Sequence, residues 1–476
     1  MAFVSAGESV VVAAVMSKVF VLERRTAELL RVLDMETAAA VPVADKSGKL
    51  WYTEQIQTLC CSLSPLDRWL AVADNRKRLF LWKLHHSDAQ PRCISIHKQA
   101  TAICFGGVSS SDADSGTVIV SDRFGHVTGY PINELPSVDA FQAPSINVGN
   151  GEPLPVCDTQ FECNSQTDFS QDFTQDTFAS DTSGPFQLPY PGEASTVAKT
   201  ETDAPDELEE DEELKVGKVL VGAISMFLDV KLNSNQRFLA VCDRDEKVRI
   251  CHFPNTYNIE SFCLGHEDYV RTIAFISLPC CGLPPKEVLV SGSGDRTLRV
   301  WDFLQAKCLH TIELSDSEDK GVKEVSVCPK YNLLSVLRDK AESVLVYKLR
   351  CSVSPAETKI YADLVSEVEI AQAIWSAVLD QEGKLWVLTR KQPGSQVENA
   401  NAIETYQYLP DCGSMQHCRD FGYKTALEIG KIYEGAWEDM PRLSKQSGYK
   451  NYDRYKERQE EKFRSKRARL EDFEDY

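Results

Sequence analysis

The sequence predicts an all-β fold, a seven-bladed β-propeller in which small four-stranded sheets are arranged in a ring. Two observations lead to this prediction. Two short strands joined by a tight turn recur seven times along the chain, and another strand rich in β-branched or aromatic residues precedes most of these hairpins. A ring of such sheets leaves only short, protected edges, so it is a stable way to fold many short strands.

The repeat is clearest where two segments align without a gap. Residues 63–82 (LSPLDRWLAVADNRKRLFLW) and 232–251 (LNSNQRFLAVCDRDEKVRIC) share an arginine, a Leu-Ala-Val run and an aspartate at matching positions. Residues 288–302 (VLVSGSGDRTLRVWD) form another clear copy. The four remaining copies lie at residues 9–23, 120–130, 333–349 and 383–409.

One long acidic segment, residues 133–217, interrupts the repeat. Between Asn150 and Glu213 seventeen Asp and Glu residues face the single Lys199. This composition cannot bury enough apolar surface to offset the entropy lost on ordering, so we expect a disordered insertion between the third and fourth blades. The predicted domains are therefore blades 1–3 in residues 1–132, the insertion in 133–217, blades 4–7 in 218–435 and a charged tail in 436–476.

The formal net charge of −19 is concentrated in this insertion, and the rest of the chain is close to neutral. No apolar run is long enough for a transmembrane helix, and we expect no contact with a membrane. Sixteen cysteines without a signal peptide indicate reduced thiols rather than a disulfide framework. We expect a nuclear protein, or one that is both nuclear and cytoplasmic.

The C-terminal tail is rich in basic residues and helix formers. Between Lys450 and Arg469 nine Lys and Arg face four Asp and Glu, so we expect a charged helix. Two interpretations remain open for this helix. It is a solvated terminal helix, or it attracts RNA phosphates in a salt-dependent way.

No catalytic constellation is recognisable along the chain. It has no phosphate-binding loop, no dinucleotide fingerprint and no nucleophile elbow. Cys412, His417 and Cys418 lie close together but lack the paired spacing of a structural zinc site. We therefore expect no catalytic residue, no metal and no cofactor, and the sequence favours a binding platform over an enzyme.

The fifth repeat carries a more specific motif. Its sequences LGHEDYVRTIAF and SGSGDRTLRVWD resemble the WD-repeat signature. The resemblance implies a structural tetrad in which His266 donates to Asp295 at the turn, while Ser291 and the indole of Trp301 extend the network. A structural role for His266 is favoured over a catalytic one, because a buried network of this kind stabilises only when every member is satisfied.

The segment LDVKLNSNQRFLAVCDRDEKVRI, followed by IESFCLGHEDYV, resembles the non-catalytic WD-repeat subunit of the tRNA (guanine-N(7)-)-methyltransferase, and the basic tail is similar as well. The resemblance implies that the propeller docks against a catalytic methyltransferase subunit as a heterodimer and stabilises it. It also implies that tRNA is reached through that complex, with the tail as one candidate contact. The implied partner interface is Asp245, Glu246, Lys247 and Arg249.

Alternatives remain at these positions. Arg249 aligns with Arg299 of the fifth repeat, so it either braces the hairpin or contacts the partner. Glu246 aligns with Lys77 and Arg296, so this turn differs in charge from its sister repeats. The alternative function is a general nuclear WD-repeat scaffold for protein interactions, and a stand-alone enzyme is the least favoured class.

Overall fold

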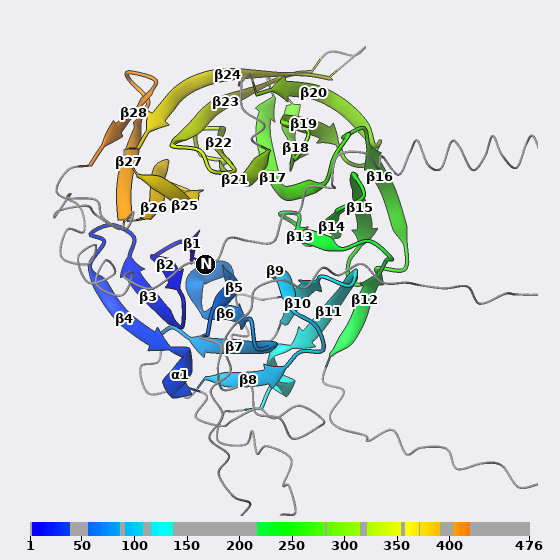
Figure 1. Cartoon of the computed structure of the whole chain (residues 1–476). Helices are drawn as coiled ribbons and strands as arrows, with labels where there is room; N and C mark the ends of the chain where they lie inside the picture. The colour runs from blue at the N-terminus through cyan, green and yellow to red at the C-terminus, as the bar shows by residue number, and fades with distance from the viewer. Residues whose placement is uncertain are drawn as a thin grey trace, which may run out of the picture. The chain divides into compact units, whose positions relative to one another are not determined.

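The computed structural model forms seven four-stranded antiparallel sheets arranged as the blades of a β-propeller (Figure 1). It describes residues 2–38, 56–85, 91–107, 116–136, 217–280, 283–314, 321–353, 358–370, 372–390 and 403–418. Within them the only α-helix is the single turn α1 (Met35–Ala38). The predicted all-β, seven-bladed fold is confirmed. Residues 137–216 of the predicted disordered insertion (133–217) and the predicted helical tail (436–476) lie outside the described residues.

Each blade is made of four strands that follow one another in the chain. Blade 1 comprises β1 (Ala2–Ala6), β2 (Val10–Val15), β3 (Lys18–Glu23) and β4 (Leu29–Asp34). Blade 2 comprises β5 (Thr58–Leu63), β6 (Trp69–Asp74), β7 (Arg78–Lys83) and β8 (Arg92–Ser95). Blade 3 comprises β9 (Ala100–Gly106), β10 (Thr117–Asp122), β11 (His126–Pro131) and β12 (Lys218–Gly222).

The second half of the propeller contains four blades. Blade 4 comprises β13 (Phe227–Leu232), β14 (Phe238–Asp243), β15 (Lys247–His252) and β16 (Ile259–Leu264). Blade 5 comprises β17 (Val270–Cys280), β18 (Leu283–Ser293), β19 (Thr297–Asp302) and β20 (Lys307–Glu313). Blade 6 comprises β21 (Val322–Cys328), β22 (Leu333–Arg338), β23 (Ser343–Val353) and β24 (Thr358–Glu369). Blade 7 comprises β25 (Ala373–Leu379), β26 (Lys384–Arg390), β27 (Ile403–Leu409) and β28 (Ser414–His417).

The seven hairpins that the sequence predicts are the central strand pairs of the seven blades. Their middle strands are buried on both faces; in β6, for example, all six residues are buried. The apolar core therefore lies between neighbouring blades rather than in one central cluster. This explains why the middle strands read as nearly continuous apolar runs instead of strict alternation.

The predicted position of the acidic insertion is wrong by one strand. After the insertion, β12 pairs with β11 of blade 3, with Val221 opposite Val127, and therefore forms the outer strand of that blade. The insertion lies within blade 3 rather than between blades 3 and 4. The sequence did not indicate this, because a short β-branched strand after a long gap fits either blade equally well.

The ring closes by side-chain packing between blades 7 and 1, and within the described residues each of these two blades is built from its own four consecutive strands. Phe20 and Leu22 of blade 1 pack in one buried cluster with Trp386 and Leu388 of blade 7. The backbone N–H of Val4 in β1 also donates to Ser376 Oγ in β25, at 3.1 Å. The sequence did not identify which strand closes the ring, and in the structure the fourth strand of blade 7 is β28 from the same part of the chain.

Candidate partner-binding site

The charged stretch between β14 and β15 forms a tight turn that Asp243 holds in place. Asp243 Oδ1 accepts hydrogen bonds from the backbone N–H groups of Asp245 (2.9 Å) and Lys247 (3.1 Å). Asp74 and Asp122 make the same pair of bonds, two and four residues ahead, at the equivalent turns of blades 2 and 3, and Asp380 makes it at the β25–β26 turn of blade 7. Asp243 is buried and belongs to the scaffold of the turn.

Burial raises the pKa of the Asp243 carboxyl above its ordinary value. The backbone N–H and the charge of Lys247 act in the opposite direction and lower it, while the charge of Asp245 adds to the rise. The Asp243 carboxyl is thus partly desolvated, and the charged residues Asp245 and Lys247 lie close enough to shift its pKa.

Glu246 occupies the left-handed position of this turn, with φ at 73°. Lys77 (φ 59°) and Arg296 (φ 68°) hold the corresponding positions in blades 2 and 5, and Gly125 (φ 82°) holds that of blade 3. Acidic and basic residues thus occupy the same left-handed backbone conformation in equivalent turns. The backbone conformation therefore does not require an acidic residue at position 246.

Arg249 lies on β15 and reaches from blade 4 to blade 3. Its Nη1 donates to the carbonyl oxygen of Gly222 on β12 at 3.1 Å, and its guanidinium carbon lies 5.4 Å from the centre of the Phe262 ring. Arg249 and Phe262 are also cross-strand neighbours in the β15–β16 pair. Arg249 thus braces two blades, and it remains partly exposed.

Exposed apolar side chains lie on the outer strands β12 and β16 of blades 3 and 4 and in the loop after β12. Leu264, opposite Lys247 in the sheet, is 60% exposed, Phe262 is 37% exposed and Ile224 is fully exposed. A Cβ placed on Gly222 would meet no atom within 4 Å, so the surface beside the guanidinium is open. We call this surface the blade 3–4 rim, and its members are Val219, Gly222, Ile224, Lys247, Arg249, Phe262 and Leu264.

A cluster of exposed apolar residues with charged side chains at its border is typical of a protein-interaction surface. The predicted interface residues thus fall into two groups. Asp245 and Glu246 lie in the turn, while Lys247 and Arg249 lie on β15 within the rim. The sequence did not single out Ile224, Phe262 and Leu264. The one signal it offered was the segment IESFCL, in which apolar residues do not alternate with polar ones as in a strand with one solvent face.

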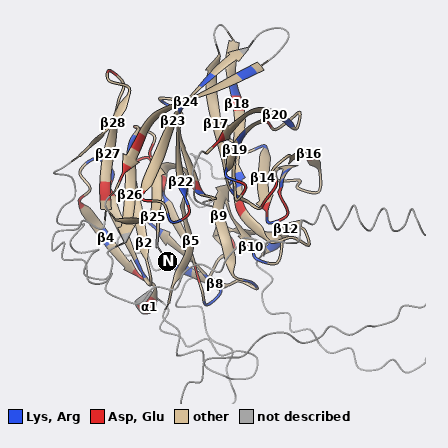
Figure 2. Cartoon of the chain, turned by 45° about the horizontal axis from the view of Figure 1, so that its top comes forward, with Lys and Arg blue, Asp and Glu red and all other residues tan. Residues whose placement is uncertain are grey.

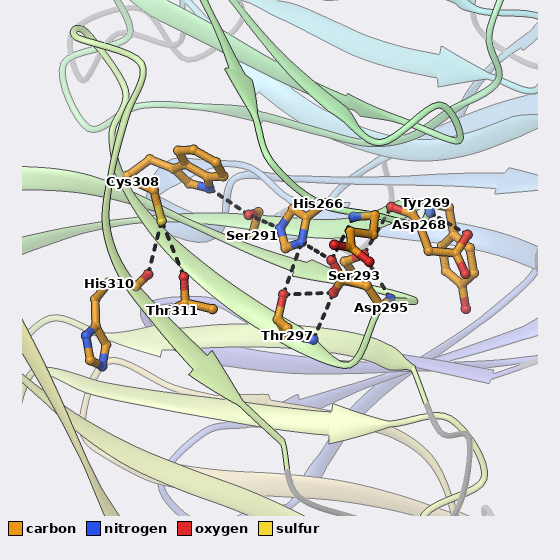
Figure 3. A network of polar contacts seen from close by, with 12 residues as sticks. His266, Asp268, Tyr269, Ser291, Ser293, Asp295, Thr297, Cys308, His310 and Thr311 are labelled. Carbon is orange, nitrogen blue, oxygen red and sulfur yellow. Dashed lines mark hydrogen bonds and ion pairs between the residues drawn. The ribbon is translucent and has the colours of Figure 1, made fainter. Parts of the chain in front are cut away.

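The four residues of the predicted tetrad lie in one hydrogen-bonded chain of blade 5, and Figure 3 labels His266, Ser291 and Asp295 of this chain. His266 Nδ1 lies 2.8 Å from Asp295 Oδ2, and His266 Nε2 lies 2.7 Å from Ser291 Oγ. Trp301 Nε1 donates to the same Ser291 Oγ at 2.8 Å. Trp301 is 1% exposed and His266 is 5% exposed, so the chain is sealed from solvent. It links the loop before β17 to β18 and β19, which is a structural use of the histidine.

The carboxyl of Asp295 is stabilised in its charged form. Burial alone raises its pKa, but the hydrogen bond and charge of His266, together with the backbone N–H of Glu267 and a side-chain bond from Thr297, outweigh burial and lower the pKa far below its ordinary value. Because the folded pKa lies below the unfolded one, the carboxylate contributes stability that is complete above about pH 4 and is lost as the pH falls.

We expect Asp295→Asn to lower the free energy of unfolding by about 1–3 kcal/mol at pH 7, since His266 loses a charged hydrogen-bond partner. The difference between the wild-type and variant proteins should shrink as the pH falls from about 4 towards 3. Urea unfolding at several pH values measures this difference. A constant difference from pH 7 to pH 3 would contradict this assignment of the ionised carboxyl.

The described residues contain no group of three or more His, Cys, Asp or Glu side chains that could hold a metal ion. Cys412, His417 and Cys418 are therefore not gathered into such a group. Across the same residues, no helix has the length and apolar character needed to cross a lipid bilayer.

The ring of seven blades and the His-Ser-Asp-Trp chain define the class: this is a WD-repeat β-propeller. Within that class, residues 191–389 match the family model described as the tRNA methyltransferase TRM82 WD40 domain. The matched segment contains the charged turn, the whole blade 3–4 rim and the tetrad. The resemblance that the sequence motifs indicate is therefore confirmed.

Curated relatives carry a matching name. The zebrafish (Danio rerio) protein named tRNA (guanine-N(7)-)-methyltransferase non-catalytic subunit wdr4 is 30% identical over 190 residues, which cover 37% of this chain and 42% of that protein. The Anopheles gambiae protein named non-catalytic subunit wuho of the same enzyme is 28% identical over 212 residues, covering 44% of this chain and 51% of its own. The Dictyostelium discoideum protein, also named wdr4, is 37% identical over 118 residues, which cover 25% of this chain and 23% of that protein. The chain thus matches about half or less of the length of these relatives.

Proposed function

We propose that this protein is the non-catalytic subunit of a tRNA 7-methylguanosine methyltransferase, which docks against the catalytic subunit and stabilises it. The observation that carries the proposal is the combination of the charged turn at Asp245 and Glu246 with the apolar blade 3–4 rim, both within the segment that resembles the family. The names of the relatives support the same assignment. We also propose that the complex acts in the nucleus, or in both nucleus and cytoplasm.

The two parts of the site have different roles in docking. Exposed apolar side chains such as Phe262 and Leu264 gain stability when a partner covers them. Charged groups at the border fix the register and steer the encounter more than they add affinity. Because Arg249 is already held by Gly222 and Phe262, it is ordered before binding and loses little side-chain entropy on docking.

A methylation assay tests the proposal. The purified protein with tRNA and S-adenosylmethionine should transfer no methyl group, whereas adding it to the catalytic subunit should raise that subunit's activity at least tenfold. Methyl transfer by the protein alone would contradict the non-catalytic assignment. If the protein is instead a general nuclear scaffold, adding it should leave the rate of methyl transfer by the catalytic subunit unchanged.

We propose further that this subunit contacts tRNA electrostatically, through its basic tail and through the turns of blades 2 and 3. The backbone N–H of Ile96 donates to the carbonyl oxygen of Lys77 at 2.8 Å. This bond places the turn at Lys77 next to the loop that carries Lys98. Lys98 Nζ lies 4.3 Å from the centre of the Phe124 ring, and Phe124 is 58% exposed. Cations beside an exposed ring suit the phosphates and unstacked bases of an RNA loop.

Charge reversal of Lys77, Lys98 and Arg123 together should weaken tRNA binding by the purified protein and lower the slope of log affinity against log salt by roughly 2–3. Fluorescence anisotropy at several salt concentrations measures both quantities. An unchanged slope would leave the tail as the remaining proposed contact. The matched control reverses three cations on β12, β20 and β23, namely Lys218, Lys307 and Arg350.

A further inference from the structure

Two thiols from neighbouring blades, one in blade 5 and one in blade 6, lie beside each other. Cys280 ends β17 of blade 5 and Cys351 lies on β23 of blade 6, and their Sγ atoms are 3.3 Å apart. The two residues are separated by 71 positions in the chain. All thirteen cysteines in the described residues are free thiols.

The strands that carry these thiols are unusually long. β17, β18 and β23 contain 11 residues each and β24 contains 12, whereas the central strands of blades 1 to 4 contain 6. Figure 2 shows the ends of these two hairpins reaching past the other blades, side by side. The extra length brings β17 and β23 together outside the ring of central strands.

Apolar packing holds the two extensions against each other. Leu278 on β17 and Leu349 on β23 are fully buried, and Ile360 on β24 joins them in the same cluster. The three strands thus share one apolar cluster, and Cys351 packs against it. The thiol pair is therefore kept together by the fold and is not a chance approach of two loose loops.

We propose that Cys280 and Cys351 form an oxidation site, in which a thiol-disulfide oxidant such as glutathione disulfide converts the pair into a disulfide that joins blade 5 to blade 6. The sulfur atoms must approach by roughly 1.2 Å to reach the length of a disulfide bond, about 2.05 Å. The β17–β18 pairing has an irregularity between Leu278 and Cys280, so the backbone beside the thiol departs from regular ladder geometry.

The reaction balances in two exchange steps. Cys351, the more exposed of the two, loses its proton and attacks one sulfur of glutathione disulfide; the S–S bond breaks and the first glutathione leaves as a thiolate that takes up a proton. Cys280 then loses its proton and attacks the Cys351 sulfur of the mixed disulfide, which releases the second glutathione. Two protein thiols are oxidised, and one glutathione disulfide is reduced to two thiols.

The environment makes this pair slow to oxidise at neutral pH. Burial, together with the hydrogen bond and charge of Cys280, raises the pKa of Cys351 to about 12, and the nearby Lys286 opposes this rise. Lys286 is itself paired with Asp302 at 2.7 Å. Because the thiolate is the attacking species, oxidation should be faster at pH 8.5 than at pH 7. The site would then respond to sustained oxidation rather than to brief exposure.

Peptide mapping without reduction tests the proposal. The full chain is treated with glutathione disulfide at pH 8.5, alkylated and digested with trypsin. We expect residues 272–286 and 351–359 to be recovered as one linked peptide that dithiothreitol separates. The linked protein should also melt a few degrees higher than the reduced protein, since the link constrains the unfolded chain.

Three serine variants make the assignment specific, because residues 272–286 also contain Cys281. Cys281→Ser should keep the link, while Cys280→Ser and Cys351→Ser should each abolish both the link and the gain in melting temperature. Equal melting temperatures of the reduced proteins verify that the variants are folded. The proposal is overturned if the wild-type protein shows no linked peptide while its other thiols are consumed, or if Cys280→Ser retains the link.

Discussion

Replacing Trp301 by alanine is expected to lower the free energy of unfolding by about 3–5 kcal/mol, the largest effect of any substitution considered for this protein. The indole is 1% exposed, packs at the core between blades 4 and 5 and donates to Ser291 Oγ. Its removal would leave a cavity and take away the indole N–H that donates to that hydroxyl. Urea unfolding followed by circular dichroism measures the loss.

Trp301→Phe is the matched control for this variant. It retains an aromatic ring in the core and removes the N–H donor and a smaller part of the side-chain volume, so it should cost less than half as much as alanine. A loss below about 1 kcal/mol for Trp301→Ala would contradict the structural role given to the tetrad, because large buried aromatic side chains rarely tolerate truncation.

Charge reversal in the turn, Glu246→Lys, is expected to weaken binding of the catalytic subunit at least tenfold, about 1.4 kcal/mol, and to leave the melting temperature of the propeller within about 2 °C. The stability should hold because Lys77 and Arg296 already occupy the corresponding left-handed positions in sister turns. The substitution therefore changes the charge and not the backbone. Affinity measured by biolayer interferometry, beside a melting curve, separates the two effects.

Lys77→Glu provides the matched control, since it reverses charge at the same turn position in blade 2. It should leave the affinity for the catalytic subunit unchanged. If Glu246→Lys bound the partner as tightly as the wild-type protein, the interface would have to lie away from the turn of blade 4. The remaining candidate would then be the apolar part of the blade 3–4 rim.

Much of the fold could be predicted because the relevant signals are local. An aspartate two residues before a backbone N–H favours a tight turn, and the copies at Asp74, Asp122 and Asp243 make part of the repeat visible in the sequence. The strands on either side carry β-branched and aromatic residues that favour extended backbone. This strand pattern also revealed the weaker hairpins that lack the turn aspartate.

Features that depend on distant contacts could not be read in this way. The pairing of Val221 with Val127 crosses an insertion of about eighty residues, so no local pattern assigns β12 to blade 3. The exposure of Phe262 and Leu264 depends on what the neighbouring blade leaves uncovered. The bond from Arg249 to the Gly222 carbonyl likewise joins two blades, which is why alignment alone could not separate a bracing arginine from an interface arginine.

We propose that this propeller binds a tRNA guanine methyltransferase through the turn of blade 4 and the blade 3–4 rim. Size-exclusion chromatography of the purified protein mixed with the catalytic methyltransferase subunit of the same organism tests this interaction directly. We expect the wild-type protein to elute in one peak that contains both proteins in equal amounts. The variant that combines Glu246→Lys and Arg249→Glu should elute separately from the catalytic subunit. Separate elution of the wild-type protein and the catalytic subunit would show that this interface does not exist.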